Sequence, residues 1–239
     1  MTPNFRKIYH SFLYLLYPPQ CLHCGSGVYD PEDRFCEGCT SLLELIDPAE
    51  RCPECFSSYY DPEIRYCVSC FKHRSYVTRA AAAFPYEGPA RSIVRKMKYA
   101  NQPYLAQGAA SYMVAQFTRL DWPMPDLIVP VPMAVTHRFL RGYNQSVLLA
   151  QHIAEMLQRP MVEALHRSCG DYSQAGLSRE QRESLDGSTI TLRDKYDLRD
   201  RCLLLVDDVM TTGSTIKRCS EMLLHGCPNS IYSLTVCKT

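Results

Sequence analysis

Residues 203–216 read Leu-Leu-Leu-Val-Asp-Asp-Val-Met-Thr-Thr-Gly-Ser-Thr-Ile, and this stretch decides which fold the sequence predicts. Four apolar residues are typical of a short buried strand, and Asp207 and Asp208 follow at its carboxyl end. A turn rich in hydroxyl groups and glycine then opens a helix. In an open parallel sheet, ligands bind just beyond the carboxyl ends of strands, where loops lead into helix N-termini.

The turn at residues 211–215 suits an anion, because free N–H groups at a helix N-terminus bind phosphate. Two adjacent carboxylates do not suit that same phosphate; they suit the hydroxyls of an attached sugar or a Mg²⁺ ion. The pattern therefore indicates a sugar phosphate. The alternative is an ordinary helix start capped by Thr211, Thr212 or Ser214 without a ligand. A cap needs only one hydroxyl, however, and it gives no reason for the carboxylate pair.

This stretch resembles the signature that phosphoribosyltransferases use for 5-phosphoribosyl-1-pyrophosphate (PRPP): apolar residues, two acids and Thr-Thr-Gly-x-Thr. The matching residues are Asp207, Asp208, Thr211, Thr212, Gly213 and Thr215. The resemblance implies that Asp207 and Asp208 hold the ribose hydroxyls. It also implies that residues 211–215, Ser214 included, wrap the 5-phosphate.

The chain has 239 residues, enough for one large domain or two small ones, and its two ends differ in charge. Residues 1–70 hold five Lys and Arg against ten Asp and Glu, whereas residues 71–239 hold 21 against 15. We therefore expect two modules, residues 1–73 and 74–239, with different partners. The basic second module suits a polyanionic ligand.

No apolar stretch approaches the roughly 18 residues that predict a membrane span. The nearest, residues 12–17, is six residues long and ends at Pro18-Pro19, and no cleavage site follows it. We interpret it as an amphipathic helix packed on the body; a weak membrane or partner anchor is the alternative. We expect a cytoplasmic protein that associates with membranes, if at all, through a partner.

Eight of the thirteen cysteines form four Cys-x-x-Cys pairs, with 11, 12 and 11 residues between successive pairs. The pairs are Cys21/Cys24, Cys36/Cys39, Cys52/Cys55 and Cys67/Cys70. Each pair offers half of a tetrahedral Zn²⁺ site, so the pattern predicts two structural Zn²⁺ ions in a small double zinc ribbon. Modules with so little core depend on the metal for folding free energy.

Three questions about the cysteine module stay open at this point. Disulfides would need an oxidising compartment, and no export signal is visible. Sequential pairing of the knuckles is simpler than cross-bracing, and we favour it. Direct binding of nucleic acid by this module is disfavoured, because such binding draws on Lys and Arg, and the module is acidic. A structural or protein-docking role is the better interpretation.

After residue 73 the pattern alternates between strands and helices, which predicts an α/β fold with a parallel sheet covered on both faces. We expect strands at residues 77–86, 127–131, 161–165, 202–206 and 231–236, and helices at residues 89–98, 104–119, 144–158 and 214–225. With the PRPP signature, this corresponds to a type I phosphoribosyltransferase-like sheet.

A basic loop follows the strand at residues 127–131. In phosphoribosyltransferases the loop after the first core strand grips pyrophosphate, which implies that Val131, Pro132, Arg138 and Arg141 contact that group. A solvated charged loop is the alternative for any single arginine. Residues 141–145, Arg-Gly-Tyr-Asn-Gln, resemble Arg-Gly-Phe-Asn-Gln of the ComF family, which fuses cysteine knuckles to such a domain.

Lys98-Tyr99 resembles the Lys-Tyr of the same family and implies that Lys98 contacts PRPP. The alternative is a lysine that complements the dipole at a helix end.

The polar stretch at residues 168–187 is too long for an ordinary connection. In the family the matching region is a lid that closes on PRPP, with Arg179 and Arg182 as catalytic arginines alongside Asp207 and Asp208. The family pattern places an Asn where this chain has Leu185, which is a departure in the lid.

The resemblance to the ComF family covers almost the whole chain and implies transfer of phosphoribosyl from Mg²⁺-bound PRPP to an acceptor that the sequence does not name. Positioning and electrostatics would then carry catalysis. The ComF association with natural transformation implies competence proteins or single-stranded DNA as further partners. Two alternatives remain: a non-catalytic factor that binds single-stranded DNA during DNA uptake, and a PRPP-sensing regulator.

Overall fold

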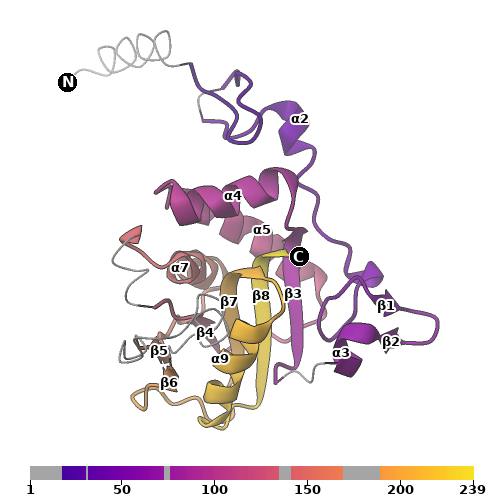
Figure 1. Ribbon diagram of the computed structural model, residues 1–239. Coiled ribbons are helices and arrows are strands. Elements are labelled where there is room, and N and C mark those ends of the chain that lie inside the picture. Colours follow the sequence, from indigo (N-terminus) through magenta and orange to yellow (C-terminus); the bar gives the residue numbers. More distant parts are fainter. Residues whose placement is uncertain (1–17, 31, 73–75, 135–140, 169–188) are drawn as a thin grey trace, which may run out of the picture.

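Four parallel strands form the central sheet, in the order β3–β8–β7–β4 (Figure 1). The computed structural model describes residues 18–30, 32–72, 76–134, 141–168 and 189–239. The strands are β3 (Arg79–Pro85), β4 (Leu127–Pro130), β7 (Cys202–Met210) and β8 (Ser230–Lys238). Together with two clusters of four cysteines before the sheet, this confirms the predicted fold class.

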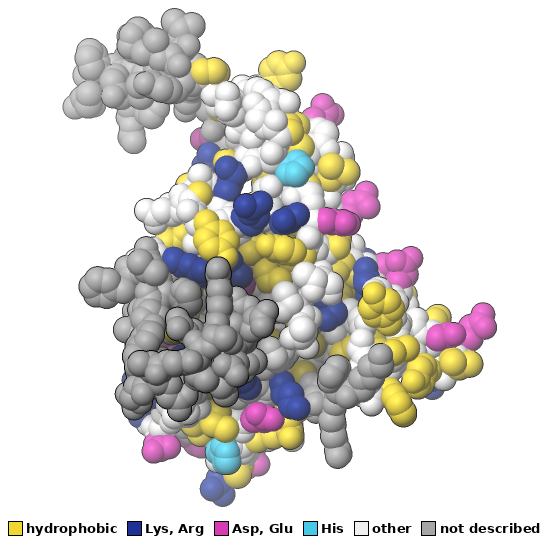
Figure 2. All heavy atoms as spheres, in the orientation of Figure 1, with side chains coloured by type: hydrophobic (Ala, Val, Ile, Leu, Met, Phe, Trp, Pro, Cys, Tyr) yellow, Lys and Arg dark blue, Asp and Glu magenta, His cyan; other side chains and the backbone are white. Residues whose placement is uncertain are grey.

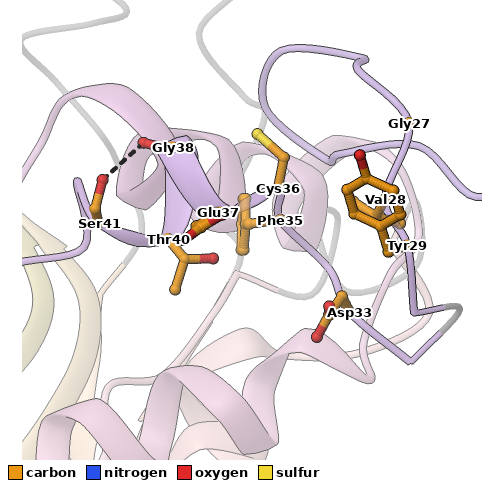
Figure 3. A pocket seen from close by; sticks show the side chains of 10 residues that line it. All are labelled: Gly27, Val28, Tyr29, Asp33, Phe35, Cys36, Glu37, Gly38, Thr40 and Ser41. Carbon is orange, nitrogen blue, oxygen red and sulfur yellow. Dashed lines mark hydrogen bonds between the residues drawn. The ribbon is translucent and has the colours of Figure 1, made fainter.

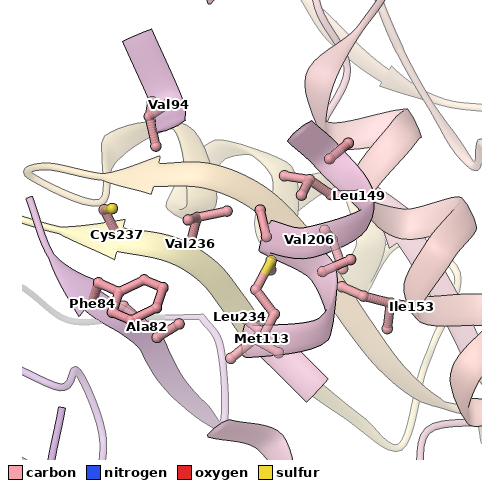
Figure 4. Close-up of a cluster of buried hydrophobic side chains, with 14 of the residues drawn as sticks. Ala82, Phe84, Val94, Met113, Leu149, Ile153, Val206, Leu234, Val236 and Cys237 are labelled. Atoms are coloured by element: carbon pink, nitrogen blue, oxygen red, sulfur yellow. The ribbon is translucent and has the colours of Figure 1, made fainter. Parts of the chain in front are cut away.

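Helices cover both faces of the sheet, as the alternating pattern predicts. The helices α4 (Gly88–Tyr99), α5 (Leu105–Arg119) and α7 (Gln145–Leu157) lie on one face, and α9 (Ser214–Leu224) lies on the other (Figure 1). Leu149 and Ile153 of α7 pack with Val206 and Leu234 of the sheet in the larger core cluster (Figure 4). Among the described residues, no helix is both long and apolar enough to cross a membrane.

The predicted element bounds are close to the observed ones, with two corrections. The strand predicted at residues 202–206 continues to Met210 and includes both carboxylates, because β8 pairs with it along that whole length. The strand predicted at residues 161–165 is wrong. Only a single bridge joins Met161 to Ile128, and a short strand β5 (Leu165–Arg167) follows and pairs antiparallel with β6 (Ile190–Leu192).

The cysteine module comprises short elements around two turn-rich ribbons. They are α2 (Glu37–Thr40), the 3₁₀ helix η1 (Pro48–Glu50), β1 (Tyr60–Asp61), β2 (Tyr66–Cys67) and α3 (Val68–Lys72). The first ribbon lies above α4, and the second lies beside β3 (Figure 1). The predicted module boundary at residues 73 and 74, and the helix predicted at residues 12–17, lie outside the described residues.

The segment between the two ribbons and the first knuckle of the second ribbon form hydrogen bonds with the free edge of β3. The Ile46 N–H donates to the Ala83 carbonyl (2.9 Å), and the Ala80 N–H donates to the Glu54 carbonyl (2.7 Å). Ile46 and Phe56 are buried in the same core cluster as the helices and the sheet. Since an exposed edge strand is a template for aggregation, these residues protect the sheet edge.

Gln116 fastens this segment to α5, and its substitution should destabilise the protein. The Gln116 side chain is fully buried and donates from Nε2 to the Ile46 carbonyl (2.9 Å). We expect Gln116→Ala to lower the free energy of unfolding by about 1–3 kcal/mol, because a buried carbonyl loses this donor. Urea unfolding checks this. Gln107→Ala, at an exposed position of the same helix, is the control and should have little effect.

Candidate functional site

The two neighbours of β7 differ in length, so its carboxyl end has a strand partner on one side only. Pairing between β4 and β7 ends at Pro130 and Val206, whereas pairing between β7 and β8 continues to Met210 and Lys238. Asp207 and Asp208 lie on β7 just beyond the last pair with β4. Because side chains alternate along a strand, the two carboxylates leave opposite faces of the sheet.

Asp207 is held by two hydrogen bonds to one carboxylate oxygen. The Ser146 hydroxyl at the start of α7 donates to Asp207 Oδ1 (2.8 Å), and the Asp208 N–H donates to the same atom (2.9 Å). Burial raises the pKa of Asp207 to about 7, and the neighbouring charge of Asp208 adds to the increase, although these hydrogen bonds oppose it. Without a ligand, the ionised form of this carboxyl is therefore disfavoured.

Asp208 forms an ion pair with Lys98 at the end of α4. Lys98 Nζ lies 2.7 Å from Asp208 Oδ1, and the side chain of Asp208 is only 7% exposed. Burial alone would lower the pKa of Lys98, but the Coulombic attraction and hydrogen bond of Asp208 outweigh it, so the pKa is raised. Lys98 is therefore a charged group that neutralises one of the two carboxylates.

The turn after β7 presents hydroxyls and amides to solvent. Thr211, Thr212 and Ser214 are exposed, and Gly213 has a φ of 77°, a conformation that favours glycine. No side chain caps α9, although the Ser214 N–H donates to Thr212 Oγ1 at 3.4 Å. The alternative of a turn that serves only to cap the helix is thus weakened, because the helix starts without a side-chain cap.

The loop after β4 begins beside the same end of β7. Val131 is buried and its N–H donates to the Val206 carbonyl (2.9 Å); Pro132 follows at the partly exposed surface. The Asn144 side chain donates to the Val131 carbonyl (3.0 Å) and accepts from the Ser146 N–H (3.0 Å), so it caps α7. Asn144 therefore places Ser146 against Asp207.

The two sequence motifs that resemble the ComF family contact each other. Tyr143 and Gln145 donate to the Met97 carbonyl at 2.5 and 3.4 Å. The guanidinium of Arg141 lies 5.3 Å from the ring centroid of Tyr99. The end of α4, which carries Lys98, is thereby fixed to the start of α7. Sequence reasoning named Lys98 and Arg141 separately but missed these contacts.

Arg167 is a further basic residue near the site, at the start of the polar stretch that also holds Arg179 and Arg182. It ends β5, and its pKa is lowered chiefly by burial and then by the charge of Arg218, an effect that Cys219 and Asp207 oppose. The Arg167 guanidinium thus shares the electrostatic environment of Asp207. The only signal in the sequence is its position next to the long polar stretch.

Three of the predicted arginines lie outside the described residues: Arg138, Arg179 and Arg182. The same holds for the predicted lid, apart from Ser168. The structure gathers the other predicted residues of the site around the end of β7. Their assignment to PRPP, and the catalytic roles of Asp207 and Asp208, stay predictions.

The eight knuckle cysteines form two separate groups of four. Cys21, Cys24, Cys36 and Cys39 make one group, and Cys52, Cys55, Cys67 and Cys70 make the other. Within each group all sulfurs lie within 4.8 Å of one another, and Cys24–Cys36, Cys52–Cys70 and Cys55–Cys67 are each 3.6 Å apart. The pairing of the knuckles is sequential, as favoured from the sequence.

These distances fit zinc and do not fit disulfides. A disulfide needs about 2.05 Å between sulfurs, whereas a tetrahedral Zn²⁺ with Zn–S bonds of about 2.3 Å separates its sulfurs by nearly 4 Å. Burial raises the pKa of Cys55 to about 11, with a further increase from the charge of Cys52. A cation would relieve that repulsion between thiolates. Both groups could therefore hold a zinc ion.

A hollow of about 700 Å³ lies in the first ribbon, away from the end of β7 (Figure 3). Val28, Tyr29 and Phe35 contribute apolar surface to it, and Asp33 and Glu37 are acidic. Among the described residues that line it there is no Lys or Arg. Its chemistry does not suit a phosphorylated ligand, so the strand end remains the candidate site.

Comparison with known proteins finds similarity to two bacterial proteins. It is 27% identical over 210 residues to competence protein F of Haemophilus influenzae, covering 85% of this chain and 90% of that protein. The chain is a homologue of competence protein F. It is also 26% identical over 167 residues to the DNA utilization protein YhgH of Escherichia coli K12, covering 67% of this chain and 72% of that protein. The predicted resemblance to the ComF family is confirmed.

The other two comparisons are less informative. No protein-family model matches the chain. Similar solved structures include a purine phosphoribosyltransferase from Pyrococcus horikoshii, with 16% identity and a TM-score of 0.36 over 55% of this chain and 81% of that one. Glutamine PRPP amidotransferase from B. subtilis has 16% identity and a TM-score of 0.39 over 59% of this chain and 30% of that one. At such scores, the strand order and parallel pairing carry the fold assignment.

The raised pKa of Asp207 predicts a stability that depends on pH. The pKa of this carboxyl is about 3.9 in the unfolded chain and higher in the folded protein. Its contribution to the free energy of unfolding is therefore complete below the unfolded-state pKa and is lost as the pH rises through the folded-state pKa. We therefore expect Asp207→Asn to increase the melting temperature of Mg²⁺-free protein at pH 8, and much less at pH 5. Calorimetry at both pH values measures this.

The matched control for this experiment is Asp121→Asn, which removes an exposed carboxylate and leaves the strand end intact. If Asp207→Asn changed the melting temperature equally at pH 5 and pH 8, the raised pKa of Asp207 would be contradicted.

The two cysteine groups predict two zinc ions per chain. We expect elemental analysis of purified protein to give two, and Cys55→Ser to give about one, because three thiolates hold Zn²⁺ less tightly than four. Cys227→Ser, at an exposed cysteine outside both groups, is the control and should leave two. A content near zero in the unaltered protein would disprove the zinc ribbons.

Proposed function

We propose that this protein binds PRPP together with Mg²⁺ at the carboxyl end of β7 and transfers its phosphoribosyl group to an acceptor. The observation that carries the proposal is the carboxylate pair, Asp207 and Asp208, beyond the last β4–β7 pair and directly before an uncapped helix N-terminus. The carboxylates can accept hydrogen bonds from sugar hydroxyls. The amides that can bind a phosphate follow only a few residues later in the chain.

In this proposal the two ends of the ligand have different partners. The ribose hydroxyls donate to Asp207 and Asp208, while the 5-phosphate accepts from the amides and hydroxyls of residues 211–215. The α9 dipole adds an attraction for the phosphate. Ser146 acts as a positioning residue, because its hydrogen bond fixes the orientation of the Asp207 carboxylate.

The positive charges near the site suit a pyrophosphate leaving group. Lys98 and Arg141 lie on the side of β7 where the loop after β4 ends, and Val131 and Pro132 begin that loop. Arg138, Arg179 and Arg182 are further candidates for the same group. Fixed positive charges near a developing anion lower the barrier without a covalent enzyme intermediate.

The donor set also fits Mg²⁺. Oxygen ligands are what this ion prefers, usually one or two carboxylates with substrate phosphates. Burial, and then the charge of Asp208, raise the pKa of Asp207, and a bound cation would oppose both effects. Asp207 and Asp208 are the residues that would face the ion. Mg²⁺ bound with PRPP would supply neutralisation of the pyrophosphate charge.

Binding of PRPP tests this proposal directly. We expect calorimetry with PRPP and Mg²⁺ to show saturable binding that falls at least about a hundredfold in Asp207→Asn/Asp208→Asn, since each charged hydrogen bond is worth about 1.5–3 kcal/mol. Asp121→Asn/Asp194→Asn, two exposed carboxylates, is the control. Absence of binding to zinc-replete unaltered protein would refute the site.

A second candidate function, binding of single-stranded DNA, is supported by the outer face of α4. Arg91, Arg95 and Tyr99 follow one another at four-residue steps and are all exposed. Figure 2 shows Lys and Arg side chains gathered over this helix. A basic track beside an exposed aromatic ring suits a strand whose bases stack. The homologues' names, competence and DNA utilization, agree with this role.

A salt series tests the second candidate. We expect affinity for a single-stranded oligonucleotide to fall steeply with salt, and Arg91→Gln/Arg95→Gln to reduce the slope of log K against log salt by about 1.4, two phosphate contacts at about 0.7 each. Arg199→Gln/Arg201→Gln, exposed at the other end of β7, is the control. Equal slopes for the two variants would remove α4 from the interface.

A further inference from the structure

Lys98 lies where a ligand of Asp208 would have to lie. Its Nζ is 2.7 Å from Asp208 Oδ1, a short charged hydrogen bond. The side chains of Lys98 and Asp208 are 22% and 7% exposed, so solvent reaches this pair chiefly at the lysine. A sugar hydroxyl or a Mg²⁺ ion that approaches Asp208 Oδ1 must therefore displace the ammonium group or share the oxygen with it.

Sharing that oxygen with a metal ion is electrostatically unfavourable. Mg²⁺ binds carboxylate oxygens at about 2.1 Å, so the ion and the ammonium group would lie within about 5 Å of each other. Two like charges at that separation repel strongly in a site shielded from water. At this oxygen, Asp208 can therefore serve Lys98 or Mg²⁺ but not both.

The backbone beneath Lys98 is fixed, while its side chain is free to rotate. Tyr143 and Gln145 both donate to the carbonyl of Met97, the residue before Lys98. The four-carbon stem of a lysine is flexible, and rotamer changes are fast. Nζ can therefore leave Asp208 without any movement of α4 or α7.

The same contacts bring the stem of Lys98 near the loop after β4. Asn144 lies between the two residues that hold Met97, and its side chain donates to the Val131 carbonyl at 3.0 Å. Val131 begins the loop to which we assigned the pyrophosphate. A pyrophosphate at that loop would offer Nζ several charged oxygens in exchange for one oxygen of Asp208.

We propose that Lys98 makes metal binding conditional on PRPP. With no PRPP bound, its ammonium group occupies Asp208 and keeps Mg²⁺ off the carboxylate pair. When PRPP and Mg²⁺ bind together, Nζ moves from Asp208 to the pyrophosphate, and Asp208 becomes available to the ribose and the ion. This inference rests on the proposed function and goes beyond it, because a lysine that only contacts PRPP would not compete with the metal.

Two binding measurements on Lys98→Met should change in opposite directions. Mn²⁺ alone, used in place of Mg²⁺ and followed by electron paramagnetic resonance, should bind at least about tenfold more tightly, because the carboxylate pair loses its internal cation. PRPP at saturating Mg²⁺ should bind at least about tenfold more weakly in calorimetry, because a charged hydrogen bond to pyrophosphate is lost.

Lys96→Met is the matched control. Lys96 lies two positions earlier on α4 and therefore on a different side of the helix, so both affinities should be unchanged. Adding Asp208→Asn to Lys98→Met should abolish the gain in Mn²⁺ affinity, because the carboxylate that Lys98 releases is then missing.

Equal Mn²⁺ affinity in Lys98→Met and unaltered protein would overturn the inference even if PRPP binding fell, because Lys98 would then be a ligand contact only. Tighter PRPP binding to Lys98→Met would also overturn it, because Lys98 would then only obstruct the site. Absence of PRPP binding to unaltered protein would refute the proposed function itself, whatever the Mn²⁺ result. Should Lys98→Met fail to fold, Lys98→Gln gives the same two measurements with a polar side chain.

Discussion

Strand β7 pairs with partners of unequal length, and the candidate site depends on that difference. On one side the pairing with β8 continues through Asp207 to Met210, so the backbone of the carboxylates stays within the sheet. On the other side β4 ends at Pro130, so no strand covers that edge. The ends of α4 and α7 fill this space instead and bring Lys98 and Ser146 to the two carboxylates. A paired strand therefore carries the anionic groups, while helix ends carry the groups that orient and neutralise them.

The contacts of Met97 connect two parts of the chain that the sequence presents as separate motifs. The Met97 carbonyl accepts hydrogen bonds from both Tyr143 and Gln145. Arg141 lies over the ring of Tyr99, two residues after Met97. A change in any of these residues would therefore move Lys98 relative to Asp208. This gives a physical reason for the presence of Lys-Tyr and Arg-Gly-Tyr-Asn-Gln in one protein, independent of any direct contact with a ligand.

Local patterns in the sequence predicted most of the fold. The Cys-x-x-Cys pairs predicted both cysteine groups, because two sulfurs of one tight turn converge wherever the turn is placed. The apolar residues 203–206 predicted β7, but its end was predicted too early, since charged side chains interrupt the apolar pattern while β8 continues to pair. The strands β5 and β6 were missed because each is three residues long and their pairing spans a long polar stretch.

The site was predictable in part, for a similar reason. Asp207, Asp208 and residues 211–215 are neighbours in sequence, and their chemistry indicates a sugar phosphate on its own. Lys98 is 110 positions away from Asp208, and nothing local shows that the two form an ion pair. Ser146 gave no signal at all, because one serine at a helix start has many ordinary uses.

The hydrogen bonds of Ile46 and Glu54 with β3 have a practical consequence for anyone who divides this chain. Cutting at the change in composition near residue 73 would remove the backbone groups of Ile46 and Glu54 that now pair with β3. The fragment would display β3 as an open strand with Ala80 to Ala83 uncovered, a surface suited to joining a second copy edge to edge. Precipitation of such a fragment would reflect this lost cover and would say nothing against the fold of the intact chain.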